Sequence, residues 1–405
     1  MTAIAFNPMT PEQRENPFDV LELARREQPV FFAQAVGLWV VTRHEDVLAV
    51  LKDHRNFSSV GALKSSPAPY PPEVLEVLDQ GHPDMPYIIE VDPPLHERIR
   101  GLVTKAFTPR RIAELEPRIV EIAQELLDGF AADGQADIIE RFAWPLPLRV
   151  LGELFGVPRE DLEQLHHWGT DWLLMQQELP VERRVEHAHG LVRLQRYLVD
   201  AVERRFDEPT DDLIGALVAV RGEIYPPLTA VEIAGLPLDL MVAGHVTVTR
   251  AVGSTLHRMF SYPALRDHLL DPEVAPKAIE ELLRLESPAQ GLFRITTQEV
   301  EIGGVTLPKG ARVMAHFASA NRDQCVFAHP DAYDPERDDI KHHLAFGKGI
   351  HFCIGAPLGR LELGVALPAL LRRLPGLRPG AQLAAREEVF FARGFRTLPV
   401  EWDLP

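Results

Sequence analysis

The spacing of apolar positions divides the chain into a mixed first part, a long helical middle and a mixed end. Residues 30–32 and 38–41 are short apolar runs typical of strands. From residue 95 to about residue 260 the apolar spacing is helical, as from Ile112 to Leu126. The pattern therefore predicts a mainly α-helical protein with small β-sheets.

One predicted helix is apolar on nearly all sides. Thr229 and Glu232 form a capping-box pattern, and apolar residues then continue to about Met259. Such a helix should cross the core. Pro237 should bend it or remove a backbone hydrogen bond, and residues 243–244 form a second weak point where a bulky ligand can approach the backbone.

Shorter elements surround this helix. The pattern predicts helices at 275–285 and 358–371 and a hairpin at 300–307 around two glycines. Residues 58–86 are rich in Pro, Gly and Ser, which indicates a surface loop carrying a short helix at 72–78. Long loops in compact domains are often functional.

Composition limits the class of protein. No linker or repeat divides the 405 residues, so we expect one domain, with 1–15 as a flexible N-terminal segment. A formal charge of -17 argues against nucleic acid or an anionic membrane as the main partner. The N-terminus shows no signal-peptide pattern and there are two cysteines, so we expect a cytoplasmic protein, and a monomer.

The most constrained loop surrounds Cys353. Residues 346–355 read Phe-Gly-Lys-Gly-Ile-His-Phe-Cys-Ile-Gly. The glycines permit positive φ and close approach of a flat ligand, and loop amides that point at the sulfur tune its basicity. The only other cysteine is Cys325, so a disulfide would consume this thiol. Ligation or nucleophilic chemistry is therefore favoured.

Three other interpretations of this loop are weaker. A dinucleotide-binding fingerprint would need a third glycine and a preceding strand. A zinc site formed by His342, His343, His351 and Cys353 has suitable residue types, but it lacks the paired short spacings of structural zinc sites. A cysteine that is only a small core residue would be the favoured interpretation of a lone buried cysteine, but this loop argues against it.

The pattern Phe-Gly-x-Gly-x-His-x-Cys-x-Gly resembles the haem-binding loop of the cytochrome P450 family, and every signature position matches. The resemblance extends from about residue 16 to residue 402. It implies the cytochrome P450 fold, with haem b between the long central helix and the helix after the cysteine loop. It also implies that the Cys353 thiolate is the axial iron ligand and that O2 is a co-substrate.

The resemblance also assigns residues to the haem and to its support. Basic side chains at matching positions clamp the haem propionates, here His96, Arg100, Arg294 and His351. Further implied cofactor contacts are Ala243, Gly244, Phe346, Gly347 and Gly355. Glu281 and Arg284, three apart on one helix, resemble the family's Glu-x-x-Arg pair, and Arg337 its second arginine. Without the resemblance, His96 and Arg100 would fit an exposed helix face equally well, and Glu281 with Arg284 would be better explained as a solvated ion pair.

Residues 243–248 resemble the oxygen-binding segment of the central helix, usually Ala-Gly-x-acid-Thr-Thr. Thr247 matches the threonine thought to hydrogen-bond bound dioxygen, and we predict that it is catalytic. Val246 replaces the acid and Val248 the second threonine. Proton delivery must then use Thr247 and water, with His245 or Thr249 as further candidates. The plainer alternative is a mid-helix threonine bonded to its own i−4 carbonyl.

Substrate contacts should come from the family's substrate-recognition segments, which are 58–89, 168–189, 240–247, 289–293 and 390–394. The apolar candidates are Ile88, Ile89, Leu240, Leu292, Phe293 and Phe391. They suggest a pocket for a hydrophobic terpenoid, steroid, fatty acid or polyketide-like molecule, although core packing would explain each one singly.

The resemblance therefore predicts a bacterial-type monooxygenase that hydroxylates a hydrophobic molecule. Electrons should come from a separate ferredoxin- or flavodoxin-type donor and its reductase. The expected docking patch is cationic and consists of Lys105, Arg110, Arg111, Lys348 and Arg360. There are two alternatives, a haem protein that binds ligands without turnover and a peroxide-driven oxygenase. The absence of the acid at Val246 favours the first of them.

Overall fold

The computed structural model describes residues 4–65 and 69–404, which form two compact units. In the described residues, unit 1 comprises 4–58, 116–146 and 247–404, and unit 2 comprises 59–65, 69–115 and 147–246. The expected class is confirmed, because helices account for 55% of the structure and the sheets are small. The predicted loop at 58–86 contains a helix at Pro72–Leu78, and its residues 66–68 lie outside the described part of the chain.

The largest sheet lies in unit 1 and has the strand order β1-β2-β8-β5-β3. Its strands are β1 (Val30–Ala33), β2 (Leu38–Val41), β3 (Phe57–Ser58), β5 (Leu292–Thr296) and β8 (Arg312–Ala315). β2 and β8 are parallel, with Trp39 opposite Val313, and the other pairs are antiparallel. Buried residues of this sheet, such as Val41 and Val313, share a core with helix α3 (His44–Lys52).

The smaller sheets also belong to unit 1. β6 (Val300–Ile302) and β7 (Val305–Leu307) form the predicted hairpin, and its two glycines have φ angles of 54° and 76°. A three-stranded sheet has the order β4 (Gln135–Asp137), β12 (Pro399–Glu401) and β9 (Arg378–Pro379). β10 (Ala385–Arg386) pairs with β11 (Phe395–Thr397).

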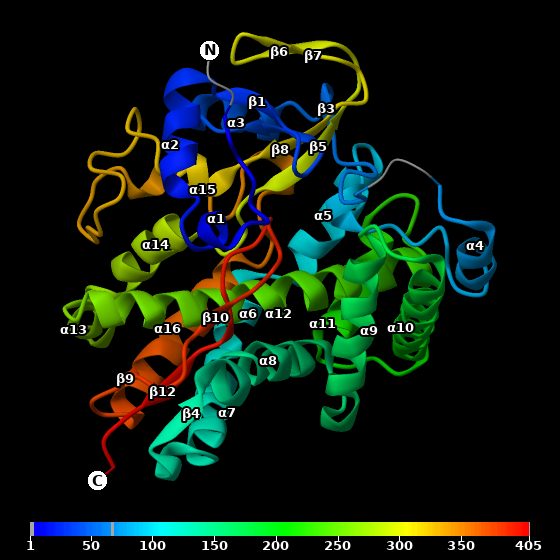
Figure 1. The fold of residues 1–405 in the computed structure, drawn as a ribbon. Coiled ribbons are helices and arrows are strands. Elements are labelled where there is room, and N and C mark those ends of the chain that lie inside the picture. Colours follow the sequence, from blue (N-terminus) through cyan, green and yellow to red (C-terminus); the bar gives the residue numbers. More distant parts are fainter. Residues whose placement is uncertain (1–3, 66–68, 405) are drawn as a thin grey trace. The chain divides into compact units, whose positions relative to one another are not determined.

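Unit 1 contains further α-helices besides α3 (Figure 1). They are α1 (Pro11–Glu15), α2 (Phe18–Glu27), α7 (Glu116–Asp128), α13 (Leu265–Leu270), α14 (Ala275–Glu286), α15 (Phe317–Ala320) and α16 (Ala356–Arg373). α16, drawn in orange, packs against α7, α13 and α14. The cysteine loop leads directly into α16, so this packing fixes the position of the loop.

Unit 2 is helical in its described residues. Its α-helices are α4 (Pro72–Leu78), α5 (Leu95–Ala106), α6 (Pro109–Glu114), most of α8 (Pro145–Phe155), α9 (Leu162–Met175), α10 (Val181–Asp207) and α11 (Leu213–Val220). α9 and α4 both pack against α10, and α11 packs against α5 and α10. A short 3-10 turn, η1 (Ile88–Glu90), precedes α5.

The predicted central helix is α12 (Ala230–Ser261), whose residues up to Val246 belong to unit 2 and the remainder to unit 1. The capping box forms as predicted: the Thr229 amide donates to Glu232 at 2.8 Å, and the Glu232 amide donates to Thr229 Oγ1 at 3.2 Å. The helix continues through Pro237. Among the described helices α12 alone is long and apolar enough to cross a membrane, a test that core helices also pass, and 56% of its most apolar window is buried.

Candidate functional site

The backbone of the cysteine loop folds back on itself. The Cys353 amide donates to the Phe346 carbonyl at 3.0 Å. Gly347 and Gly349 have φ angles of 67° and 76°, in the left-handed region that favours glycine. A Cβ on Gly349 would lie 2.2 Å from the Leu51 carbonyl oxygen, so no side chain fits there. Glycine at this position therefore lets the loop pack against the end of α3.

The thiol of Cys353 lies immediately before α16. Cys353 is half-buried, and a Cβ on Gly355 would come within 3.9 Å of its sulfur. No disulfide joins it to Cys325, which is exposed. The positive end of the helix dipole favours a negatively charged sulfur at this place. Its surroundings therefore suit a thiolate metal ligand.

The three charged residues predicted to support the loop come together in unit 1. Glu281 and Arg284 of α14 are fully buried and form two hydrogen bonds of 2.7 Å. Arg337 Nε donates to Glu281 Oε1 at 3.0 Å. Arg284 also donates to the Asn321 carbonyl at 2.7 Å, and the Leu344 amide donates to Asn321 Oδ1 at 2.6 Å. Through Asn321 the network reaches the residues that precede the cysteine loop.

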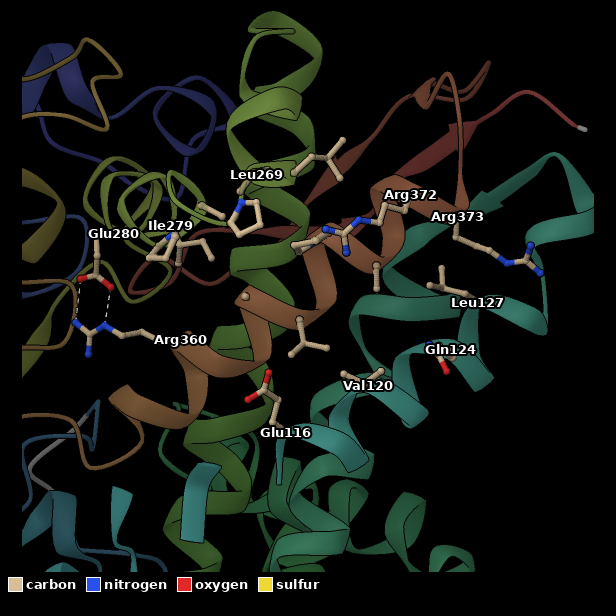
Figure 2. Close-up of a pocket in the computed structure, with 18 of the residues that line it drawn as sticks. Glu116, Val120, Gln124, Leu127, Leu269, Ile279, Glu280, Arg360, Arg372 and Arg373 are labelled. Atoms are coloured by element: carbon tan, nitrogen blue, oxygen red, sulfur yellow. Dashed lines mark hydrogen bonds and ion pairs between the residues drawn. The ribbon is translucent and has the colours of Figure 1, made fainter. Parts of the chain in front are cut away.

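A second network at the loop was not predicted. Glu280 accepts hydrogen bonds from Arg360 and His343, and Figure 2 shows the two bonds to the Arg360 guanidinium. Burial raises the pKa of Glu280, but these bonds outweigh burial and lower the pKa to about 2. Arg360 also lies over the Phe346 ring, 4.3 Å from its centroid. Phe346 is thus held by a cation–π contact.

The zinc interpretation of the loop is wrong. The structure commits His343 to Glu280, and the described residues contain no group of three His, Cys, Asp or Glu side chains arranged to hold a metal ion. The sequence could not reveal Glu280, because it looks like an ordinary charged position beside Glu281 on a helix. Glu280 becomes part of the loop's support only because the folded chain brings His343 and Arg360 to its carboxylate.

The basic residues predicted to bind propionates occur in both units. His96 and Arg100 lie one turn apart on α5 in unit 2, and His96 is only 2% exposed. Arg294 lies on β5 in unit 1, is 3% exposed and donates to the Phe293 carbonyl at 2.6 Å. His351 ends the 3-10 turn η7 (Gly349–His351), two residues before the cysteine. His96 and Arg294 are therefore not solvated surface residues.

One face of α12 is partly exposed, although the residues beside it on the same helix are buried. Val246 is half-buried. The other residues of this stretch that are not buried are Leu240, Ala243, Gly244 and Thr247, which form the open face and of which Ala243 is the most exposed. Their spacing of three and four residues places them on one helix face. Met241, Val242 and Val248 are buried. An apolar helix with such a stripe beside Thr247 is suited to contact a flat hydrophobic group.

Neither additional proton-delivery candidate faces this stripe. His245 is fully buried, and its ring packs on that of His166 of α9, with centroids 4.4 Å apart. Burial, with a smaller contribution from His167, lowers the pKa of His166 to about 4. Thr249 Oγ1 donates to the Ala143 carbonyl at 3.0 Å. Both candidates are thus engaged elsewhere, which leaves Thr247 as the polar side chain of the open face.

Comparison with known proteins decides the family. The family model described as "Cytochrome P450" matches residues 267–376. The chain is 40% identical to mycinamicin IV hydroxylase/epoxidase of Micromonospora griseorubida, over 94% of this chain and 93% of the relative. It is 36% identical to vitamin D(3) 25-hydroxylase of Pseudonocardia autotrophica, over 95% and 94%. The chain belongs to the cytochrome P450 family.

Solved P450 structures agree with this assignment. Cytochrome P450 CYP109Q5 from Chondromyces apiculatus has a TM-score of 0.86 and 38% identity, over 99% of both chains. P450BioI, solved with an acyl carrier protein bearing hexadec-9Z-enoic acid, has a TM-score of 0.85 and 30% identity, over 97% of this chain and 99% of the other. Hydroxylase and epoxidase relatives support monooxygenase activity, so this P450 is a monooxygenase.

The predicted substrate contacts of unit 1 lie together. An isolated β-bridge joins Ala289 to Ala392, and the Gln290 amide donates to the Phe391 carbonyl at 2.8 Å. This brings Phe293 and Phe391 into an edge-to-face contact, with centroids 5.9 Å apart, and Phe390 contacts both rings. Leu292, half-buried, precedes Phe293 on β5. In unit 2, Ile88 is buried and Ile89 half-buried in η1.

The predicted cationic patch of this P450 is largely neutralised, which corrects the expectation from sequence. Lys105 pairs with Glu223. The side chains of Arg110, Arg111 and Arg360 pair with Glu114, Asp211 and Glu280. Lys348 lies over the Phe352 ring, with its Nζ 5.5 Å from the centroid. Counting basic residues could not show this, because the acidic partners of Lys105, Arg111 and Arg360 are distant in sequence.

A separate groove opens among α7, α13, α14 and α16 (Figure 2). Apolar residues such as Val120 and Ile279 line it, with arginines at its rim. Arg373 pairs with Asp128 at 2.8 Å. Arg360 is the one lining residue among the positions singled out in the sequence. Glu280 also lines the groove, so the groove borders the network that holds the cysteine loop, although Cys353 is not among its lining residues.

Proposed function

We propose that this P450 inserts one oxygen atom of O2 into a large hydrophobic molecule of the polyketide or steroid-like class. Its relatives include a mycinamicin hydroxylase/epoxidase, a 6-deoxyerythronolide B hydroxylase and a vitamin D(3) hydroxylase. The apolar residues of the open α12 face and the phenylalanine cluster support a hydrophobic substrate. The electrons come from a separate ferredoxin- or flavodoxin-type protein and its reductase.

The residues present fit a haem. Cys353 offers a thiolate in a loop whose glycines leave room for a flat ligand, and this observation carries the proposal. By resemblance to the family, Arg100, His96, Arg294 and His351 would hold the propionates, and Phe346 and Gly347 would contact the ring. Ala243 and Gly244 would offer a small-residue surface of α12 to the haem. Bound haem supplies the oxygen chemistry that amino-acid side chains lack.

The chain's own groups then control protons and water. Thr247 Oγ1 donates or accepts a hydrogen bond on the open face of α12, whereas Val246 offers no proton. The Gly244 backbone packs closely on α8, since a Cβ there would lie 3.3 Å from Leu151. This packing holds the middle of α12 in place while its open face receives the substrate. Phe293 and Phe391 exclude water.

Turnover with isotope-labelled O2 tests this function. Macrolactones and secosteroids that shift the haem spin state are incubated with a ferredoxin, its reductase and a nicotinamide donor. We expect a product that carries one labelled oxygen atom from O2 and none from labelled water. Hydrogen peroxide alone should support far less product. Spin-state shifts without product would favour a ligand-binding haem protein, and equal turnover with peroxide would favour the peroxide-driven alternative.

A further inference from the structure

The segment 81–90 connects α4 to α5 in unit 2 and carries Ile88 and Ile89. α10 holds its first part. Gln195 accepts from the His82 amide at 3.0 Å and donates to the His82 carbonyl at 3.1 Å and the Tyr87 hydroxyl at 3.0 Å. One side chain thus fixes both ends of the stretch from His82 to Tyr87.

α12 holds the second part of the segment. A Cβ on Gly235 would lie 2.0 Å from the Pro86 carbonyl oxygen, so the segment's backbone rests directly on the helix. One turn further along the same helix face, Asp239 accepts a hydrogen bond from the Ile88 amide. The segment therefore contacts α12 at two places. Gly235 leaves space for its backbone, and the Asp239 carboxyl group binds the Ile88 amide.

Asp239 is an unusual residue for this position. It is only 6% exposed, and its Oδ1 is buried with no hydrogen-bond partner among the described residues. Burial raises the pKa of Asp239 well above the usual range and Glu90 raises it further, whereas the backbone amides of Ile88 and Ile89 lower it. Burying an acid on the helix costs free energy that a few backbone amides repay only in part, whereas leucine would pack without that cost. Asp239 is therefore poorly explained by stability alone.

We propose that Asp239 is a positioning residue for substrate selection: by binding the Ile88 amide it fixes the Ile88–Glu90 turn on α12. The turn carries Ile88 and Ile89, and Leu240 follows Asp239 on the helix, so one hydrogen bond sets the relation of two substrate-facing elements. This inference rests on the proposed function, in which these three apolar residues contact the substrate. Asp239 is buried against this turn, so we assign it a positioning role and not a catalytic one.

Hydrogen–deuterium exchange of the haem-loaded enzyme tests the anchor. Asp239→Leu keeps the shape but removes the acceptor, so exchange in the 81–90 segment should rise about tenfold. Asp239→Asn keeps a neutral acceptor and should stay within about twofold of the wild type. Ser254→Ala is the matched control, since Ser254 is also buried on α12 and its Oγ has no hydrogen-bond partner among the described residues. An unchanged segment in Asp239→Leu, or an equal rise throughout the protein, would overturn the proposal.

The second readout is size selection, measured with imidazole and 4-phenylimidazole, which bind haem iron through nitrogen whatever the natural substrate. In Asp239→Leu the affinity of phenylimidazole relative to imidazole should change about tenfold, with imidazole itself unaffected. Asp239→Asn and Ser254→Ala should keep the wild-type ratio. A ratio unchanged by Asp239→Leu would contradict the proposal. If imidazole failed to perturb the wild-type haem spectrum, the proposed function itself would fail, independently of Asp239.

Discussion

At the scale of single residues, the side chains of α12 that surround Thr247 are the most informative. Val246 removes the acid expected there, and the structure directs His245 and Thr249 to other partners. A single hydroxyl then has to hold the proton on the open helix face. We therefore expect this P450 to release more of its reduced oxygen as hydrogen peroxide than a P450 that retains the acid.

Thr247→Val should lower product per nicotinamide donor consumed by roughly tenfold or more, with a matching rise in hydrogen peroxide, because general acid–base groups contribute at least that much. Val246→Glu should shift the balance toward product. Thr249→Val is the control: it loses the bond to Ala143 and about 1 kcal/mol of stability, but coupling should not change. Equal effects of the two threonine variants would argue against a special role for Thr247.

Glu362 of α16 gives a pH prediction. Burial raises its pKa from 4.5 to about 8, and its Oε2 has no hydrogen-bond partner among the described residues. The folded state binds this proton more tightly than the unfolded state does. The contribution of this proton to the free energy of unfolding is therefore complete below pH 4.5 and is lost as the pH rises toward 8.

Glu362→Gln keeps a neutral side chain at every pH. It should match the wild type near pH 4.5 and be more stable by about 3 kcal/mol at pH 7, from the 1.36 kcal/mol that each pKa unit represents. Denaturant unfolding of the haem-loaded protein across this range measures the difference. A difference between the two proteins that stays constant with pH would contradict a protonated Glu362.

At the scale of elements, the cysteine loop is held by two adjacent acids of α14. Glu281 binds Arg284 and Arg337, and Glu280 binds Arg360 and His343. In the first network Glu281 and Arg284 are fully buried, so the loss of one member leaves an uncompensated charge. Order in the cysteine loop should therefore depend on α14.

Glu281→Gln should destabilise the protein by roughly 3–5 kcal/mol and weaken haem retention. Lys277→Gln on the same helix is the matched control, because the Lys277–Glu336 pair is exposed and should contribute less than about 1 kcal/mol. Unfolding midpoints and haem transfer to apomyoglobin measure the two effects. Similar losses of stability in the two variants would show that burial of the network does not determine how much it stabilises the protein.

The two networks show how far a sequence can predict a site. The Cys353 loop was predictable because its residues are contiguous and its glycines have a local physical role. The Glu281 network was expected only through family resemblance, and Glu280 was missed, because its partners lie about 60 and 80 residues away. Asp239 was missed for the same reason: its partner is a backbone amide of a distant turn.

At the scale of the whole molecule, the fold class followed from periodicity, because buried helix faces repeat every three to four residues. The sheet topology did not, since β2 pairs in parallel with β8, from opposite ends of the chain. Net charge was equally uninformative about surface patches: most of the predicted cationic residues bind carboxylates. We therefore expect the docking of an electron donor to depend less on ionic strength than it would if these five cationic side chains were unpaired.

The central claim is that Cys353 ligates haem iron as a thiolate, and the absorption spectrum of the reduced, carbon monoxide-bound protein tests it most directly. We expect the long-wavelength Soret band of thiolate ligation in the wild type and in Cys325→Ser, whose exposed thiol is the matched control. Cys353→His should move the band to the shorter wavelength of histidine-ligated haem proteins. A haem-loaded wild type with the histidine-type band, or a Cys353→His variant that keeps the thiolate band, would contradict the account.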